Sequence, residues 1–100
     1  MGKEGTMELD VRGEMCPYPA MKAREALAKL PAGECLEVLT DHAPALSTVP
    51  WEGAKLNYRS TIEPVGRGTW RIRLEPAEGT LDQKKALAEI AQRAAELSKS

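Results

Sequence analysis

Cys16 has the side chain best suited to covalent chemistry in this sequence, and it stands in the run Cys16-Pro17-Tyr18-Pro19. The residues that follow favour a helix, and Pro17 suits its first turn because the N–H that proline lacks is not needed there. A helix N-terminus has unpaired N–H groups and partial positive charge, which favour a thiolate over a thiol. Such a position can lower a cysteine pKa from about 8.5 to roughly 3.5–7.5. The run therefore predicts a reactive Cys16, and the alternative is a small capping residue without chemistry.

The other residues that could bind metal or react form weaker patterns. Cys35 stands inside a predicted strand and is interpreted as a small packing residue. The two cysteines are not in a C-x-x-C pattern, and a disulfide between them needs Cα atoms within about 7 Å, which the sequence leaves open. His42 as a base for Cys16 also stays open. Cys16, Cys35, Asp41 and His42 do not have a zinc-site spacing, so we expect no metal.

Composition limits the class of protein. The chain has 100 residues, of which 29% are charged and 42% hydrophobic, with a formal net charge of −1. This length fits one domain that folds without disulfides, and the near-neutral charge argues against a dedicated nucleic-acid binder. No apolar run of about 18 residues predicts a membrane span, and no signal peptide follows Met1. Two cysteines in such a chain indicate reduced thiols in the cytoplasm.

The hydrophobic pattern predicts elements in the order β-α-β-α-β-β-α. They are Met7–Val11, Ala20–Leu30, Glu34–Thr40, about 43–53, Leu56–Val65, Trp70–Glu75 and a helix that begins at Thr80. Asp41 is expected to cap the second helix, and Pro50 to shorten or distort it. Residues 66–68 (Gly-Arg-Gly) predict a turn, and Thr80 with Gln83 predicts a capping box. We expect a flexible tail over residues 1–6, a domain over 7–76 and a helical extension over 80–98.

The strands are expected to have one apolar and one polar face. The inward set is Met7, Leu9, Val11, Leu36, Val38, Tyr58, Ile62, Trp70, Ile72 and Leu74. The outward set is Glu8, Asp10, Arg12, Glu37, Arg59, Thr61, Arg71, Arg73 and Glu75. A helix is not expected to cover such a charged face. The last helix has an apolar stripe of Leu87, Ile90, Ala94 and Leu97, which is expected to pack beside the other helices or, alternatively, against another chain.

The first predicted strand and the loop after it resemble the signature of the TusA/SirA/YedF family of small sulfur-carrier proteins. That signature is C-P-x-P after a strand ending L-D-x-x-G, and here it is Leu9-Asp10-Val11-Arg12-Gly13-Glu14-Met15-Cys16-Pro17-Tyr18-Pro19. Supporting matches are Pro31-Ala32-Gly33-Glu34, Asp41 and Val49-Pro50-Trp51, so the resemblance covers about residues 7–75. It implies a two-layer α/β sandwich, β-α-β-α-β-β, with a mixed four-stranded sheet.

The resemblance also implies a function. Cys16 would accept a sulfane sulfur from a donor protein, a cysteine desulfurase or a rhodanese, carry it as a persulfide and pass it to an acceptor protein. Members of the family serve tRNA thiolation, molybdenum-cofactor assembly or sulfur oxidation, and the transfer needs no cofactor. The chain would thus be a cytoplasmic, sulfurtransferase-type carrier. Asp10, Gly13, Pro17 and Pro19 would support the loop and the helix N-terminus.

Lys22, Arg24 and Asp41 are candidates for contact with a partner protein. The two basic residues stand early on the first helix and would add positive potential near the thiolate, unless they form only a solvated face. Two positions depart from the family pattern. The acidic pair after the second strand is Asp41-His42 here, and Thr48 replaces an acidic residue before the Val-Pro pair. The donor, or its affinity, is therefore expected to differ.

Two other functions stay open. A regulatory or protein-interaction module would keep the fold without sulfur transfer, because a fold alone does not define a function. RNA binding would use Arg59, Arg71 and Arg73, but the net charge of −1 and the nearby Glu37 and Glu75 argue against it. The expected state is a monomer, or a weak homodimer formed through the last helix.

Overall fold

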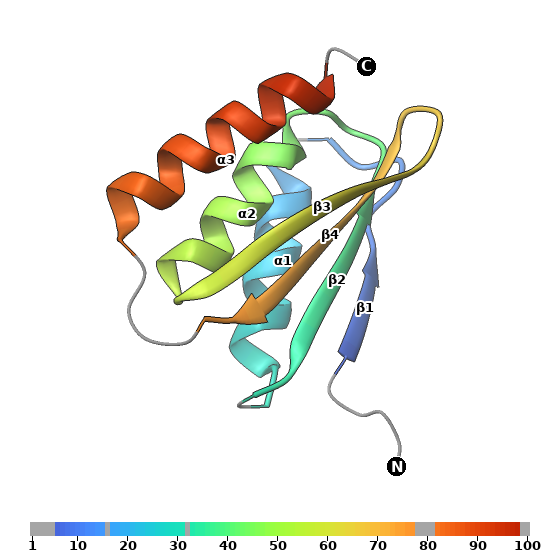
Figure 1. The fold of residues 1–100 in the computed structure, drawn as a ribbon. Helices are drawn as coiled ribbons and strands as arrows, with labels where there is room; N and C mark the ends of the chain where they lie inside the picture. The colour runs from blue at the N-terminus through green and yellow to red at the C-terminus, as the bar shows by residue number, and fades with distance from the viewer. Residues whose placement is uncertain (1–5, 16, 32, 78–81, 99–100) are drawn as a thin grey trace.

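The computed structural model describes residues 6–15, 17–31, 33–77 and 82–98. Its element order is β-α-β-α-β-β-α, which confirms the prediction (Figure 1). The elements are β1 (Thr6–Asp10), α1 (Tyr18–Lys29), β2 (Cys35–Thr40), α2 (Ala45–Lys55), β3 (Tyr58–Gly66), β4 (Thr69–Pro76) and α3 (Gln83–Ser98). Residues 1–5 of the predicted tail and Thr80 of the predicted capping box lie outside the described residues.

The four strands form one mixed sheet with the order β1-β2-β4-β3. β1 and β2 are parallel, while β4 is antiparallel to both β2 and β3. The helices lie on one face of the sheet, so the molecule has two layers (Figure 1). The mixed sheet and the two layers are as expected. Because β1 and β2 are parallel, the loops that follow them leave the same end of the sheet.

The core lies between the sheet and the helices. On the sheet side its fully buried side chains are Leu36, Val38, Ile72 and Leu74, with Val11 directly after β1, and the helices add Ala23, Leu27, Leu46 and Val49. Burial of one such Val, Leu or Ile side chain contributes roughly 1.5–3 kcal/mol. The predicted inward residues Met7, Leu9, Tyr58 and Trp70 are half-buried and pack against this core. The predicted alternation of inward and outward residues is therefore confirmed.

Helix α2 differs from its prediction at both ends. Its N-cap position is Pro44, with no capping side chain, so Asp41 as the cap was wrong. Pro50 does not shorten the helix, which continues to Lys55. Pro50 is fully buried, and packing against the core offsets the backbone hydrogen bond that proline cannot donate.

Helix α3 packs on its own domain, beside α2. Ile90 and Leu97 are buried as predicted, but Leu87 is 48% exposed and does not belong to the packed stripe. The helix begins at Gln83, and its first amides, those of Lys84 and Lys85, donate to Asp82 Oδ1 at 3.1 and 3.3 Å. Asp82 therefore caps the helix. Gln83, expected in a capping box, instead donates from Nε2 to the carbonyl oxygen of Ala54 at 2.7 Å.

No described helix is long and apolar enough to cross a lipid bilayer.

The unequal burial of two α3 residues allows a direct test of its packing. We expect Ile90→Ala to lower the free energy of unfolding by about 2 to 3 kcal/mol, because it removes a buried side chain. The matched variant Leu87→Ala removes an exposed side chain and should change it by less than about 0.5 kcal/mol. Urea unfolding monitored by circular dichroism measures both values. Equal losses for the two variants would mean that α3 does not pack in this way.

Candidate functional site

Cys16 itself lies outside the described residues, and its neighbours Met15 and Pro17 define where the loop runs. The loop connects the end of β1, at Asp10, to the start of α1, at Tyr18. It leaves the sheet at the end where the parallel strands β1 and β2 both finish. In open α/β sheets, functional residues commonly lie outside the carboxyl ends of such strands.

The N-terminus of α1 has fewer free donors than the sequence suggested. Pro17 takes the N-cap position and Pro19 follows in the first turn, and neither has an N–H. The N–H of Tyr18 donates to the carbonyl oxygen of Met15 at 2.9 Å, and the carbonyl of Pro17 accepts from Met21 at 3.1 Å. The attraction of this helix end for an anion therefore comes more from the helix dipole than from hydrogen bonds donated by unpaired amides.

Asp10 and Arg12 form a tight local pair at the start of the loop. Asp10 Oδ1 accepts from Arg12 N at 3.1 Å and from Arg12 Nε at 3.0 Å, and Asp10 Oδ2 accepts from Arg12 Nη2 at 2.8 Å. The hydrogen bonds from the Arg12 side chain, followed by the one from its backbone, lower the pKa of Asp10 to about 2. The same side-chain bonds raise the pKa of Arg12. The pair fixes the direction of the chain as it leaves β1.

Gly13 makes the sharp turn that follows. Its φ is +85°, a left-handed conformation that residues with a Cβ adopt at a cost. Its N–H donates to Asp41 Oδ1 at 2.9 Å, across 28 positions of sequence. Asp41 comes directly after β2, so its carboxylate holds the loop instead of capping α2. Together with the Val11 N–H, which donates to the carbonyl oxygen of Leu39 at 2.8 Å, this bond ties the start of the loop to the end of β2.

The basic residues near the loop differ in their pairing. The Lys22 ammonium forms an ion pair with the Glu14 carboxylate, so part of its positive charge is neutralised locally. Arg24 is exposed and forms no ion pair with any described residue. Arg12 is held by Asp10. Of the cations around this end of α1, Arg24 is therefore the one available for a partner.

Three exposed apolar side chains surround the position of Cys16 in the sequence, a feature that the sequence analysis missed. Met15, Tyr18 and Met21 are 65%, 56% and 51% exposed. We call these three residues the apolar collar. Exposed apolar patches commonly mark protein interaction sites, and three such side chains close together in sequence are candidates for one. The pattern could have been found, because Tyr18 and Met21 lie off the buried stripe of the first helix.

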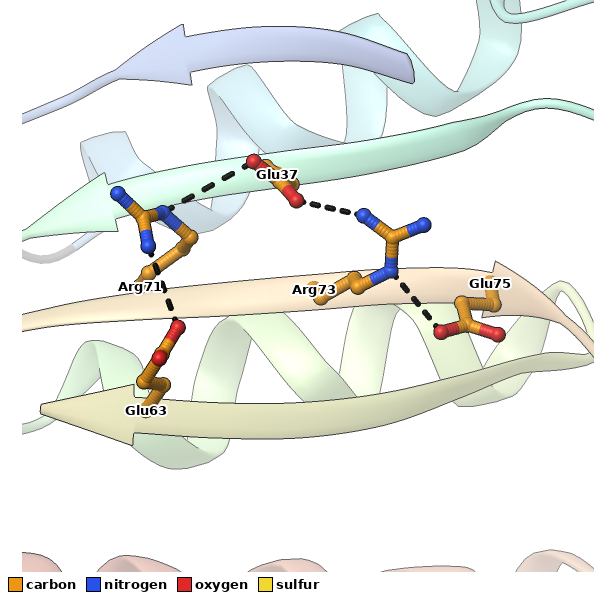
Figure 2. Close-up of polar contacts among 5 residues, drawn as sticks. All are labelled: Glu37, Glu63, Arg71, Arg73 and Glu75. Atoms are coloured by element: carbon orange, nitrogen blue, oxygen red, sulfur yellow. Dashed lines mark hydrogen bonds and ion pairs between the residues drawn. The ribbon is translucent and has the colours of Figure 1, made fainter. Parts of the chain in front are cut away.

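The outward face of the sheet carries a network of charges centred on Glu37 (Figure 2). Arg73 Nη1 lies 2.5 Å from one Glu37 oxygen and Arg71 Nε 3.8 Å from the other. Arg71 also reaches Glu63 at 3.2 Å, and Arg73 reaches Glu75 at 2.9 Å. The hydrogen bonds that Arg73 donates to Glu75, then to Glu37, raise the pKa of Arg73. Two of the three arginines considered for RNA are thus each paired with two carboxylates.

Cys35 and His42 lie apart from each other. Cys35 is a half-buried free thiol at the start of β2, at the opposite end of the sheet from Met15 and Pro17. His42 follows the end of β2, where its backbone N–H donates to Thr40 Oγ1 at 3.1 Å. Within residues 6–15, 17–31, 33–77 and 82–98, no three His, Cys, Asp or Glu side chains are grouped to hold a metal. Cys16 lies outside the described residues. A disulfide with Cys35 and the role of His42 as a base for Cys16 are therefore not tested by the structure.

The sheet, the helices on one face and the C-P-x-P run before α1 define a small two-layer α/β protein built around one cysteine loop. The family model described as "Sulfurtransferase TusA" matches residues 7–75, which include all four strands up to Glu75 and the loop. The chain therefore belongs to the TusA family. Helix α3 lies beyond the matched residues.

Individual relatives agree with this assignment. A protein of Thermotoga maritima named "Putative sulfur carrier protein" is 40% identical over 68 residues, which are 67% of this chain and 86% of the relative. A protein of the same name from Archaeoglobus fulgidus is 34% identical over 70 residues, 69% of this chain and 80% of the relative. The crystal structure of a SirA-like protein from Desulfitobacterium hafniense covers 71% of this chain and 97% of its own, with a TM-score of 0.64 and 24% identity, and so shares the fold.

The pKa of Asp10 gives a test of the loop geometry. Because it is about 2 in the folded chain and about 3.9 in an unfolded one, the pair with Arg12 stabilises the fold above about pH 4. This contribution is lost as the pH falls through about 2, when the carboxylate is protonated. We expect Arg12→Gln to return the pKa of Asp10 to near 3.9. Carboxyl ¹³C NMR titration measures it, and an unchanged low value would contradict the proposed cause.

Proposed function

We propose that the chain carries sulfane sulfur as a persulfide on Cys16. The Cys16 thiolate attacks the outer sulfur of a donor persulfide, a new S–S bond forms on Cys16, the donor S–S bond breaks and the donor thiolate leaves. The oxidation state of the sulfur is only passed on, so the step needs no external oxidant, metal or organic cofactor. In the second step, a thiolate of the acceptor protein attacks the outer sulfur of the Cys16 persulfide, and the Cys16 thiolate leaves.

One observation carries this proposal: in this TusA-family chain, the structure fixes both the turn before the C-P-x-P run and the start of the helix that the run leads into. Asp41 holds the turn at Gly13, and Pro17 and Pro19 restrict the backbone on the other side. There is no acidic residue in the first turn of α1, so no carboxylate there opposes a thiolate or an anionic persulfide. Restriction of the backbone on both sides of a reacting sulfur favours exchange, because less reordering is needed when a partner arrives.

The partners are expected to be a cysteine desulfurase or a rhodanese as donor and a second protein as acceptor, with tRNA thiolation as one destination of the sulfur. We infer that both approach the apolar collar, since it lies on either side of Cys16 in the sequence. Arg24 would add an ionic contact beside it, as its side chain has no ion pair within the described residues. Interfaces commonly combine apolar and methionine side chains at the centre with charges at the rim.

Persulfide loading can be measured directly. The chain is incubated with a cysteine desulfurase and cysteine, and its intact mass is recorded for the wild type, Cys16→Ser and Cys35→Ser. We expect a gain of one sulfur atom, reversed by reductant, on the wild type and on Cys35→Ser but not on Cys16→Ser. Loading that persists in Cys16→Ser would refute the proposal. If the wild type gains nothing, the same test with a rhodanese and thiosulfate separates a wrong donor from an unreactive cysteine.

The apolar collar can be tested with a matched pair of substitutions. We expect Met21→Asp to slow loading by a donor protein more than tenfold, because a charge would be buried in the interface. Leu87→Asp places the same charge at an equally exposed apolar residue of α3, outside the collar, and should leave the rate within about twofold. Both sites are exposed, so neither change should alter stability by more than about 0.5 kcal/mol. Equal loading rates would exclude the collar as the docking surface.

A regulatory module of the same fold is the second candidate, and one observation favours it. Pro17 and Pro19 provide no N–H, and Tyr18 donates its own to Met15, so the helix end offers little direct hydrogen bonding to a thiolate. A regulatory function predicts an ordinary Cys16 pKa of about 8.5 and no persulfide. The ultraviolet absorbance of the thiolate against pH, with Cys35→Ser as the background, separates the two functions. A strongly lowered pKa favours the carrier.

RNA binding is not supported by the charged face of the sheet. Arg71 and Arg73 are each paired with two glutamates, as Figure 2 shows, so contact with phosphate would first require breaking these pairs. Arg59 alone does not make the basic stripe that such proteins use.

A further inference from the structure

The methionines of this chain differ in how far water reaches their sulfur atoms. Three of the four lie within the described residues: Met7, Met15 and Met21. Met15 and Met21 are 65% and 51% exposed, whereas Met7 is half-buried in β1 and packs against the core. Both exposed methionines belong to the apolar collar. A dissolved oxidant therefore reaches the thioethers of the collar more readily than the thioether of Met7.

The structure holds the two exposed methionines by their backbones. The carbonyl oxygen of Met15 accepts the N–H of Tyr18 at 2.9 Å, and the N–H of Met21 donates to the carbonyl oxygen of Pro17 at 3.1 Å. Neither side chain belongs to the buried core. Chemical change at either thioether therefore leaves these hydrogen bonds and the core in place, and it alters only the surface that another molecule meets.

Both methionines lie where a partner has to approach. Met15 is the last described residue before Cys16, and Met21 lies in the first turn of the helix that follows. In the proposed sulfur-carrier function, donor and acceptor cover this part of the surface each time sulfur is transferred. Control of transfer through the collar therefore rests on that proposed function.

We propose that Met15 and Met21 form a modification site, at which hydrogen peroxide converts the thioethers to sulfoxides and thereby slows sulfur transfer. The thioether sulfur attacks one oxygen atom of the peroxide, an S–O bond forms and the O–O bond breaks. The departing hydroxide takes the proton of the transferred oxygen and leaves as water. The sulfur loses two electrons and the peroxide gains them, so the step needs no other reactant.

The sulfoxide changes the collar from apolar to polar. An unoxidised methionine is flexible and apolar, so it fits partner surfaces of different shape. A sulfoxide oxygen accepts hydrogen bonds from water, and burying it in an interface without a donor weakens binding about tenfold. Leucine at the same position stays apolar and offers no sulfur to the oxidant, which makes it the matched control.

Oxidation of the methionines differs from oxidation of the cysteines in how it is reversed. Thiol reductants return a cysteine disulfide or sulfenic acid to the thiol, whereas methionine sulfoxide is reduced by dedicated methionine sulfoxide reductases. The oxidised collar would therefore keep sulfur transfer slow after the thiols have recovered. Because each sulfoxide epimer has its own reductase, both enzymes are needed for full recovery.

The first measurement locates the modification. In the Cys35→Ser chain, Cys16 is protected as a mixed disulfide, the protein is treated with hydrogen peroxide, and dithiothreitol then restores the thiol. Peptide mass spectrometry follows the gain of one oxygen atom at each methionine over time. We expect Met15 and Met21 to gain it at least about threefold faster than Met7, because exposed thioethers meet the oxidant more often. Equal rates at all three would overturn the proposal.

The second measurement tests the effect on transfer. Loading of Cys16 by a cysteine desulfurase and cysteine is followed by intact mass before and after oxidation, with the free thiol counted after reduction. We expect the oxidised chain to load about tenfold more slowly, and both methionine sulfoxide reductases together to restore the rate. The Met15→Leu/Met21→Leu variant should load within about twofold of the unoxidised chain, both before and after the same treatment. Circular dichroism confirms that all forms are folded.

The outcomes separate control by the methionines from sulfur transfer itself. An oxidised chain that loads at the rate of the untreated chain would overturn the proposal. An equal loss of rate in the Met15→Leu/Met21→Leu variant would overturn it as well, because the loss would then arise elsewhere. Absence of loading before oxidation, with both the desulfurase and a rhodanese as donor, would refute sulfur transfer and its control together. The oxidation rates of Met15 and Met21 against Met7 would still decide whether the modification site exists.

Discussion

The alternation of side chains along β4 determines the architecture of this chain. Ile72 and Leu74 are fully buried on one face, while Arg71 and Arg73 on the other are tied to Glu37 of β2. A face with this much paired charge stays in water, because covering it with an apolar helix would desolvate the ion pairs. All three helices must therefore share the other face. Four strands span about 14 Å between their outer axes, but three helices packed side by side span roughly 16–20 Å. The third helix has to overhang the sheet, and α3 does so beside β3.

The parallel pairing of β1 and β2 has an equally direct effect on the cysteine loop. It brings the ends of both strands together, so Asp41 after β2 can accept the N–H of Gly13 after β1. The Asp10–Arg12 pair and the two prolines restrict the loop on either side of this bond. The loop is thus positioned by its backbone and by one carboxylate, with few free amides at the helix end.

Regular features were predictable from sequence because local periodicity decides them. Burial alternates from Arg71 to Glu75 of β4, and the turn at residues 66–68 has the glycine at Gly68 that its positive φ requires. The role of Asp41 was mispredicted because its acceptor function depends on a residue 28 positions away, and no local pattern encodes that contact. Leu87 was misplaced for a related reason: a helical stripe shows which side faces inward, but not where the neighbouring helix ends.

The sequence reveals the cysteine loop but not a groove beside the C-terminal helix. The C-P-x-P run can be found by its residues alone, and the role of Cys16 stays a prediction because it lies outside the described residues. The groove beside β3 has no sequence pattern of its own. It arises only when the β3 segment 58–62 and one face of α3, with the small residue Ala86, are brought together by the packing of α3 on α2.

The surface around the cysteine loop has to accept more than one partner. A protein that exchanges sulfur at one cysteine must let donor and acceptor reach the same atom in turn, so the contacts around that atom cannot be specific for only one of them. An apolar collar made of flexible methionines and a tyrosine is suited to such shared use. Specificity is then better placed elsewhere on the molecule.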